Sequence, residues 1–144
     1  MNERGFTLVE LLLSLTILSM MILLPILLIP NFHQNNEAKQ IAGKIREDLL
    51  IAQQVAMAQG KTARVQFRQT EKAMLIFVDG RTFEKIPYVD EGMSFSSRTM
   101  DIAQIGFLAN GHPQRAGTFE MAVHGKRYAY TLHIGKGRVT YREL

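Results

Sequence analysis

The sequence of 144 residues contains no cysteine and only four prolines. The absence of cysteine excludes a disulfide framework, thiolate zinc sites, iron–sulfur clusters and a cysteine nucleophile. No repeat of about 20 to 50 residues is present, and no long tract rich in Ser, Gly or Pro, so solenoid, fibrous and disordered classes have no support. At this length one compact domain is the default.

The spacings that carry catalysis or metal binding are also absent. No two of the four histidines form an H-x-x-x-H pair, and no carboxylate cluster accompanies them. Gly106 to His112 lacks the terminal Gly-Lys-Ser/Thr of a phosphate loop, and Ser94, Ser96 and Ser97 lack a G-x-S-x-G elbow. We therefore expect no catalytic residue, no metal site and no cofactor, and a protein that is not an enzyme.

Charged residues and histidine are missing from residues 11–29. As a helix this stretch is about 28 Å long, close to the hydrocarbon thickness of a bilayer. A cleaved secretory signal is the competing interpretation, but its apolar region usually runs about 7 to 15 residues and ends at a small-x-small site, which is missing here. We expect a single membrane span. The positive-inside signal is weak, and a short inside N-terminus with the C-terminal domain outside is the simpler arrangement.

Glu10 stands directly before this apolar stretch. A carboxylate costs about 2 to 3 kcal/mol at mid-membrane on insertion scales, and such groups usually have a partner or a function. Near the end of a span it could instead extend to the lipid headgroups at little cost. The residue alone leaves both explanations open.

The run Gly5-Phe6-Thr7-Leu8-Val9-Glu10, followed at once by the apolar stretch, resembles the class III signal of type IV pilins and pseudopilins. The resemblance implies a leader peptide over residues 1–5, cleavage by a prepilin peptidase between Gly5 and Phe6, and N-methylation of Phe6. Residues 6–30 would then be the transmembrane and assembly helix.

The resemblance also implies a role for Glu10 in assembly. Its carboxylate would pair with the terminal amine of a neighbouring subunit, and opposite charges in apolar surroundings attract far more strongly than in water. Helix association in lipid depends mainly on packing, so the charged pair would set the register between helices. Pro25, offset from the family's usual proline, is expected to break or kink the helix, because proline removes a backbone donor.

Residues 31–60 carry apolar side chains at helical spacing. We expect an amphipathic helix that ends at Gly60 and packs on the protein's own sheet. Gly43 inside it marks a close approach or a bend. The apolar positions are Ala38, Ile41, Ala42, Ile45, Leu49, Ala52, Val55 and Ala56.

Residues 61–144 change to short runs rich in Val, Ile, Phe, Tyr and Thr, which are typical of antiparallel strands. Turn residues predict hairpins at His124-Gly125-Lys126 and Gly135-Lys136-Gly137. The expected fold is α+β, a pilin-like lollipop with a long N-terminal helix packed on a small C-terminal antiparallel β-domain. The predicted strands are 62–68, 73–78, 82–86, 93–97, 104–108, 118–124, 127–134 and 138–142.

Segments of this region resemble the GspH/FimT-type minor pilin domain: Ile105-Gly106-Phe107, Asn110-Gly111-His112-Pro113, Gly117-Thr118 and 134–139. Within that family, the similarity is closest to minor pilins of the competence pili of Gram-positive bacteria. The resemblance implies an assembly or tip subunit needed for DNA uptake in natural transformation. Its partners would be other major and minor pilins, the prepilin peptidase, the pilus assembly platform and its ATPase, and the membrane.

The last 42 residues hold six Lys and Arg against two Asp and Glu, and so supply the whole formal net charge of +4. A basic surface attracts polyanions, although a solvated sheet face is the plainer explanation. Tyr128, Tyr130 and Tyr141 lie among these residues and are expected in the core. The candidate DNA-binding residues are Lys126, Arg127, Lys136, Arg138 and Arg142.

The leading hypothesis is a minor pilin of a competence pilus, held in the cell membrane and displayed at the cell surface in the filament. The first alternative is a minor pseudopilin of a type II secretion system. The second is a membrane-anchored receptor for DNA or wall polymer that enters no filament.

Overall fold

The computed structural model describes residues 7–135 and 138–144, without the side chains of residues 24–35. The chain divides into two compact units, Met1–Glu37 and Ala38–Leu144. The predicted leader over residues 1–5 lies outside the described residues.

The helix α1 is assigned from Leu8 to Gln59. It ends in a Schellman motif, because Gly60 adopts a positive φ of 62°, Gly60 N donates to Met57 O at 3.2 Å and Lys61 N donates to Ala56 O at 3.1 Å. The predicted helix end at Gly60 is confirmed. The predicted apolar stripe is confirmed too: its members are buried except Val55, which is half-buried.

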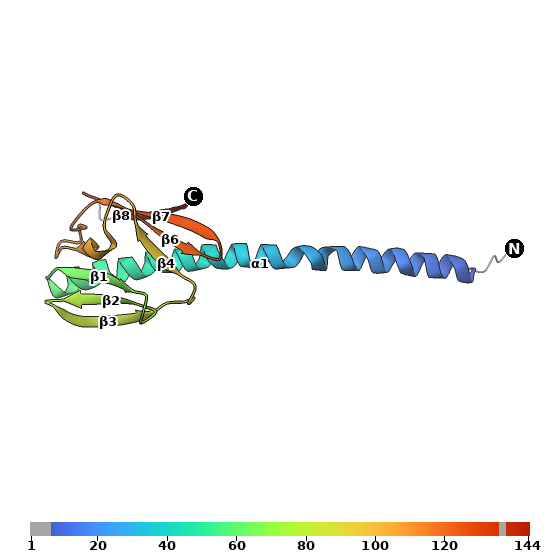
Figure 1. Ribbon diagram of the computed structural model, residues 1–144, viewed down its shortest axis with the longest axis horizontal. Coiled ribbons are helices and arrows are strands. Elements are labelled where there is room, and N and C mark those ends of the chain that lie inside the picture. Colours follow the sequence, from blue (N-terminus) through green and yellow to red (C-terminus); the bar gives the residue numbers. More distant parts are fainter. Residues whose placement is uncertain (1–6, 136–137) are drawn as a thin grey trace. The chain divides into compact units, whose positions relative to one another are not determined.

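In the described part of the chain, eight strands follow the helix and form two antiparallel sheets of four. In Figure 1 strands β1 to β3 and strands β4, β6, β7 and β8 lie along the C-terminal part of α1. The first sheet has the order β3-β2-β1-β5 and the second β4-β6-β7-β8. The strands are β1 Ala63–Arg68, β2 Ala73–Val78, β3 Arg81–Pro87, β4 Ser94–Ser97, β5 Gly106–Phe107, β6 Gly117–Val123, β7 Lys126–His133 and β8 Arg138–Glu143.

Seven of these strands agree with the predicted ranges to within one residue at each end. The strand expected at 104–108 is limited to β5, because a short 3-10 helix, η1 (Ile102–Gln104), precedes it. Asp101 caps η1 by accepting a hydrogen bond from Ala103 N at 3.0 Å. This cap turns the chain where the sequence pattern indicated a strand.

The hairpin predicted at His124-Gly125-Lys126 is confirmed. His124 and Gly125 have φ of 50° and 73°, and Val123 pairs with Lys126, as in a two-residue turn of type I′. Strands β7 and β8 also pair as a hairpin, but Lys136 and Gly137 lie outside the described residues.

One hydrophobic core unites the helix from Ala38 onward with the inner faces of both sheets. Phe67 of β1 stacks on Phe95 of β4 with ring centroids 3.9 Å apart, so the two sheets touch directly. Tyr130 of β7 stacks on Phe119 of β6 at 5.1 Å. The chain thus has the pilin-like α+β fold that the sequence predicted.

Candidate functional site

Thr7 and Glu10 exchange hydrogen bonds at the start of α1. Thr7 N donates to Glu10 Oε2 at 3.1 Å, and Glu10 N donates to Thr7 Oγ1 at 3.3 Å. The Thr7 hydroxyl also donates to Glu10 Oε2 at 2.9 Å. This is a capping box, which satisfies backbone donors that a helix start leaves open. Sequence reasoning missed it, although Thr-x-x-Glu directly before an apolar run is its signature.

The capping box uses only one of the two carboxylate oxygens of Glu10. Both side-chain bonds go to Oε2, and within the described residues Oε1 accepts no hydrogen bond. The carboxylate lies in the first turn, where the helix dipole favours negative charge. A further donor can therefore reach Glu10 without disturbing the cap. Gly5 and Phe6, the predicted cleavage and methylation residues, lie outside the described residues.

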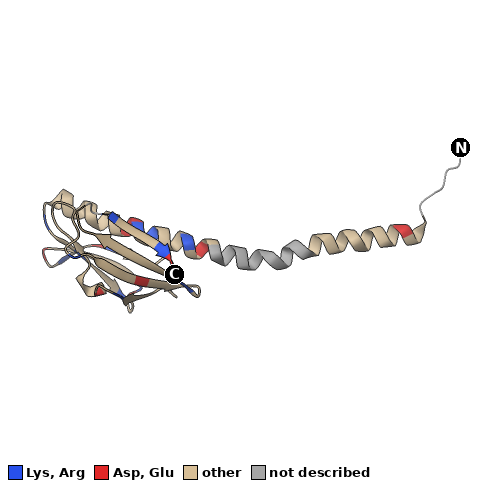
Figure 2. Ribbon diagram, turned by 90° about the horizontal axis from the view of Figure 1, so that it is seen from above, with Lys and Arg blue, Asp and Glu red and all other residues tan. Residues whose placement is uncertain are grey.

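Large apolar side chains follow Glu10 along α1 up to Leu23, and every one of them is at least 53% exposed. In Figure 2 this part of the helix carries no charged residue after Glu10. An apolar surface of this extent indicates that lipid or another helix covers it. Within residues 7–135 and 138–144, no helix has both the length and the apolarity required of a membrane span. The break predicted at Pro25 lies outside the described residues.

Three of the candidate DNA-binding residues share the outer face of the second sheet. Arg127 of β7 and Arg138 and Arg142 of β8 are exposed, and strand pairing places them on the same side. Arg142 pairs with Ala129, two residues from Arg127, so the two arginines are diagonal neighbours at about 7 to 8 Å. Arg138 and Arg142 are about 13 Å apart along one strand.

The register adds two further charges to this face. Glu120 of β6 pairs with Ala129 and forms ion pairs with Arg98 at 3.1 Å and Arg127 at 3.9 Å. Four arginines against one glutamate leave a surplus of three positive charges, counted over Arg98, Arg127, Arg138, Arg142 and Glu120. We call this set the basic face. Sequence reasoning missed Arg98 and Glu120, because only the pairing of β6 with β7 brings Glu120 to this face, and only the ion pair with Glu120 places Arg98 beside it.

The other two candidate residues do not belong to the described basic face. Lys126 lies on the opposite side of β7, where its Nζ is 2.5 Å from Glu143 Oε1. Lys136 lies outside the described residues. The expectation that Tyr128 and Tyr130 belong to the core is confirmed, since they are at most 1% exposed, and Tyr141 is half-buried.

No group of three or more His, Asp or Glu within the described part of the chain is arranged to hold a metal ion. His124 Nε2 lies 2.9 Å from Asp90 Oδ2, and Asp90 Oδ1 accepts from Gly92 N at 2.7 Å. The hydrogen bond with His124, followed by that from Gly92, lowers the pKa of Asp90. These contacts fix a turn next to β4.

Comparison with known proteins gives the following matches. The family model described as the prokaryotic N-terminal methylation motif matches residues 1–24. Competence protein ComGD of Bacillus subtilis is 29% identical over 138 residues, which cover 96% of this chain and 92% of that protein. The minor pseudopilin EpsH from the type 2 secretion system of Vibrio cholerae matches with a TM-score of 0.51 over 75% of this chain and 96% of that chain. Its 18% identity makes this a likeness of fold.

Proposed function

We propose that this chain, which is a type IV minor pilin or pseudopilin similar to ComGD, is a non-enzymatic assembly subunit of a competence pilus that serves DNA uptake. A prepilin peptidase would cleave between Gly5 and Phe6 and methylate the new amine of Phe6. The mature helix would stand in the cell membrane with the C-terminal unit outside, and then join other pilins through the assembly platform and its ATPase.

The observation that carries this proposal is the position of Glu10. It is the one charged residue among the exposed apolar side chains at the start of α1, and its Oε1 accepts no bond from the described residues. A carboxylate with a free oxygen in such surroundings suits a cationic donor from another chain, because that pair interacts strongly where water is excluded. The terminal amine of Phe6 would be such a donor, and the match of residues 1–24 to the N-terminal methylation motif supports this.

The competence assignment rests on the similarity to ComGD over nearly the whole of both chains. The rival assignment, a minor pseudopilin for protein secretion, draws on the fold shared with EpsH. A transformation assay on a deletion strain separates the two. Loss of transformation with normal protein secretion supports the competence role, and the opposite result supports the rival.

Co-purification of the mature chain with sheared filaments tests the assembly role. The variant Glu10→Gln keeps the size and the capping acceptor of the side chain but removes its charge, and we expect it to be depleted from filaments at least tenfold. The matched control is Thr7→Val, which removes the capping hydroxyl and leaves the carboxylate. If Glu10→Gln entered filaments like the parent, the charge of Glu10 would have no assembly role. Depletion of Thr7→Val alone would reduce Glu10 to a helix cap.

We further propose that the basic face contacts the phosphate backbone of duplex DNA. Its three surplus positive charges favour this ligand, and its tyrosines are turned into the core, so the face offers cations without exposed aromatic rings. Such binding is sequence-independent and weakens steeply with salt.

A further inference from the structure

We propose that a groove on the outer face of the first sheet binds single-stranded nucleic acid, at a site separate from the basic face. The groove has a volume of about 450 Å³ and is lined by residues of β1, β2, the β2–β3 turn and the loop after β5. This volume falls within the usual range for ligand sites, about 300 to 1,000 Å³. The inference does not depend on the pilus assignment.

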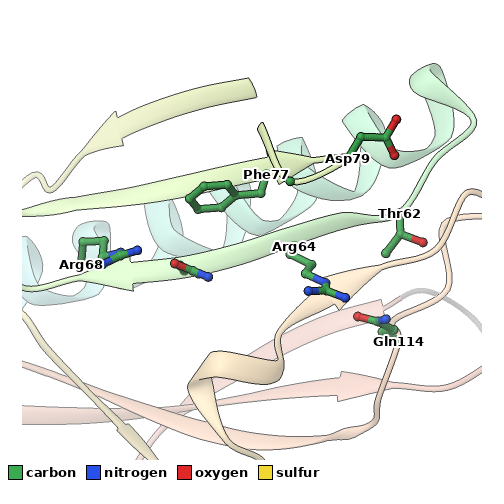
Figure 3. Close-up of a pocket in the computed structure, with 8 residues that line it drawn as sticks. Thr62, Arg64, Arg68, Phe77, Asp79 and Gln114 are labelled. Atoms are coloured by element: carbon green, nitrogen blue, oxygen red, sulfur yellow. The ribbon is translucent and has the colours of Figure 1, made fainter. Parts of the chain in front are cut away.

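The middle of the groove is built by strand register. Arg64 of β1 pairs with Phe77 of β2 on one side and with Gly106 of β5 on the other. Paired side chains of neighbouring strands stand about 4.5 to 5.5 Å apart at Cβ. Arg64 and Phe77 therefore stand on neighbouring strands of the outer face, and Figure 3 shows the guanidinium extending toward Gln114 and the ring of Phe77 extending the other way.

Gly106 makes room for a third group in this row. A Cβ at Gly106 would lie 2.9 Å from Gln114 Oε1, so the amide of Gln114 occupies the place of the missing side chain. Gln114 N also donates to Gly106 O at 2.8 Å, which holds the loop against β5. The row across the sheet is thus an aromatic ring, a guanidinium and an amide.

Arg64 and Arg68 carry the positive charge of the groove, which Asp79 also lines. Both are exposed on the outer side of β1, with half-buried Gln66 between them, and they are about 13 Å apart. The neighbouring lysines are paired: Lys61 with Asp79 and Lys85 with Glu71. Within the described residues no acid lies in ion-pair distance of Arg64 or Arg68.

These groups match the chemistry of a single strand. Arginines neutralise successive stretches of the phosphate backbone, and an aromatic side chain stacks on an unpaired base. Glutamine amides hydrogen-bond base edges. An acidic peptide would use the arginines alone and would leave the ring of Phe77 and the amides without a role. In a duplex the bases are already paired and stacked, so they could not stack on the ring of Phe77.

Fluorescence anisotropy of the full chain in detergent, with a labelled single-stranded oligo-dT of about 15 nucleotides, tests the site. We expect the double variant Arg64→Gln/Arg68→Gln to weaken binding at least tenfold. We expect Phe77→Leu, which keeps an apolar floor but removes the ring, to weaken it about tenfold without changing duplex binding. The matched control Arg127→Gln/Arg142→Gln removes the same charge from the basic face, and its effect on the single strand should stay below threefold.

Three outcomes would overturn the inference. The parent could fail to bind oligo-dT, the control could weaken binding as much as the groove variant, or a poly-glutamate peptide could bind as tightly as the oligonucleotide. None of these outcomes bears on the proposed role in filament assembly, which the Glu10→Gln variant tests separately. Unchanged thermal unfolding of each variant shows that a loss of binding is local, because all four arginines are exposed.

Discussion

The hydroxyl of Tyr130 donates a hydrogen bond to the backbone carbonyl of Ala42 at 2.8 Å, in the buried contact between α1 and the second sheet. Burial raises the pKa of Tyr130, so the phenol stays protonated and remains a donor at every physiological pH. The contact joins residues 88 positions apart in sequence. It therefore ties the helix to the sheet.

We expect Tyr130→Phe to lower the free energy of unfolding by about 1 kcal/mol. The loss is modest because a helix carbonyl retains its bond within the helix, while the aromatic stack with Phe119 is kept. Chemical denaturation in detergent measures it. Tyr141→Phe is the control, since the hydroxyl of Tyr141 makes no hydrogen bond to any of the described residues. An equal loss in both variants would contradict the role of the Ala42 contact.

Two glycines should respond to alanine in opposite ways. At Gly117 an added Cβ would lie 2.4 Å from Met100 Cβ, so we expect Gly117→Ala to destabilise the chain by about 1 to 3 kcal/mol. At Gly43 the nearest atom is Tyr141 Oη at an ordinary 3.6 Å, and Gly43→Ala should stabilise the helix by up to about 1 kcal/mol. Thermal unfolding of both variants checks the signs.

The pair of Asp90 and His124 makes stability depend on pH in acid. Since the folded pKa of Asp90 is lowered from 3.8, its contribution is fully present well above that value and is lost as pH falls through the folded pKa. We expect Asp90→Asn to be less stable than the parent at neutral pH and to lose less stability on acidification. Denaturation curves between neutral pH and about pH 2 measure this. If the free energy of unfolding fell equally with pH in the parent and in Asp90→Asn, this prediction would be wrong.

Processing at the N-terminus predicts a mature chain of 139 residues, which is 144 less the five of the leader. Mass spectrometry of membrane protein from cells with an active prepilin peptidase should show N-methylated Phe6 as the first residue. Cells without the peptidase provide the control and should keep Met1. An intact Met1 in both strains would remove the basis for filament entry.

The basic face predicts salt-sensitive binding of duplex DNA. Neutralising Lys126, Arg127, Lys136, Arg138 and Arg142 together should abolish the gel shift, and Arg127, Arg138 and Arg142 should account for most of the loss. We expect Lys126→Gln alone to have little effect, because Lys126 is paired with Glu143. An unchanged gel shift after neutralising all five residues would exclude this site.

Periodicity was sufficient to predict the buried stripe of the helix from Ala38 onward and the strands, because each depends on alternation within a short window. The turn at Asp79-Gly80, with φ of 53° and 75°, has an equally local Asp-Gly signature. The β5 boundary was missed because capping by Asp101 overrides a strand pattern.

The composition of the candidate surfaces could not be predicted from local patterns. Alternation places Arg64 and Arg68 on one side of β1, but only long-range pairing brings Gly106, and with it Gln114, next to Arg64. In the same way the register inserts Glu120 among the arginines of the basic face. Lys126 looked equivalent to Arg127 in sequence, yet adjacent strand residues face opposite sides.

Three hydrogen bonds, spaced along the helix from Ala38 onward, join it to the rest of the C-terminal unit. Ala42 accepts from Tyr130, Arg46 Nε donates to Val139 O at 3.1 Å, and Gln53 Nε2 donates to Gly111 O at 2.6 Å. A force along the helix axis acts across all three hydrogen bonds at the same time, so they share the load and do not break one after another. The C-terminal unit, Ala38–Leu144, should therefore resist a force applied along α1 and unfold in one cooperative step.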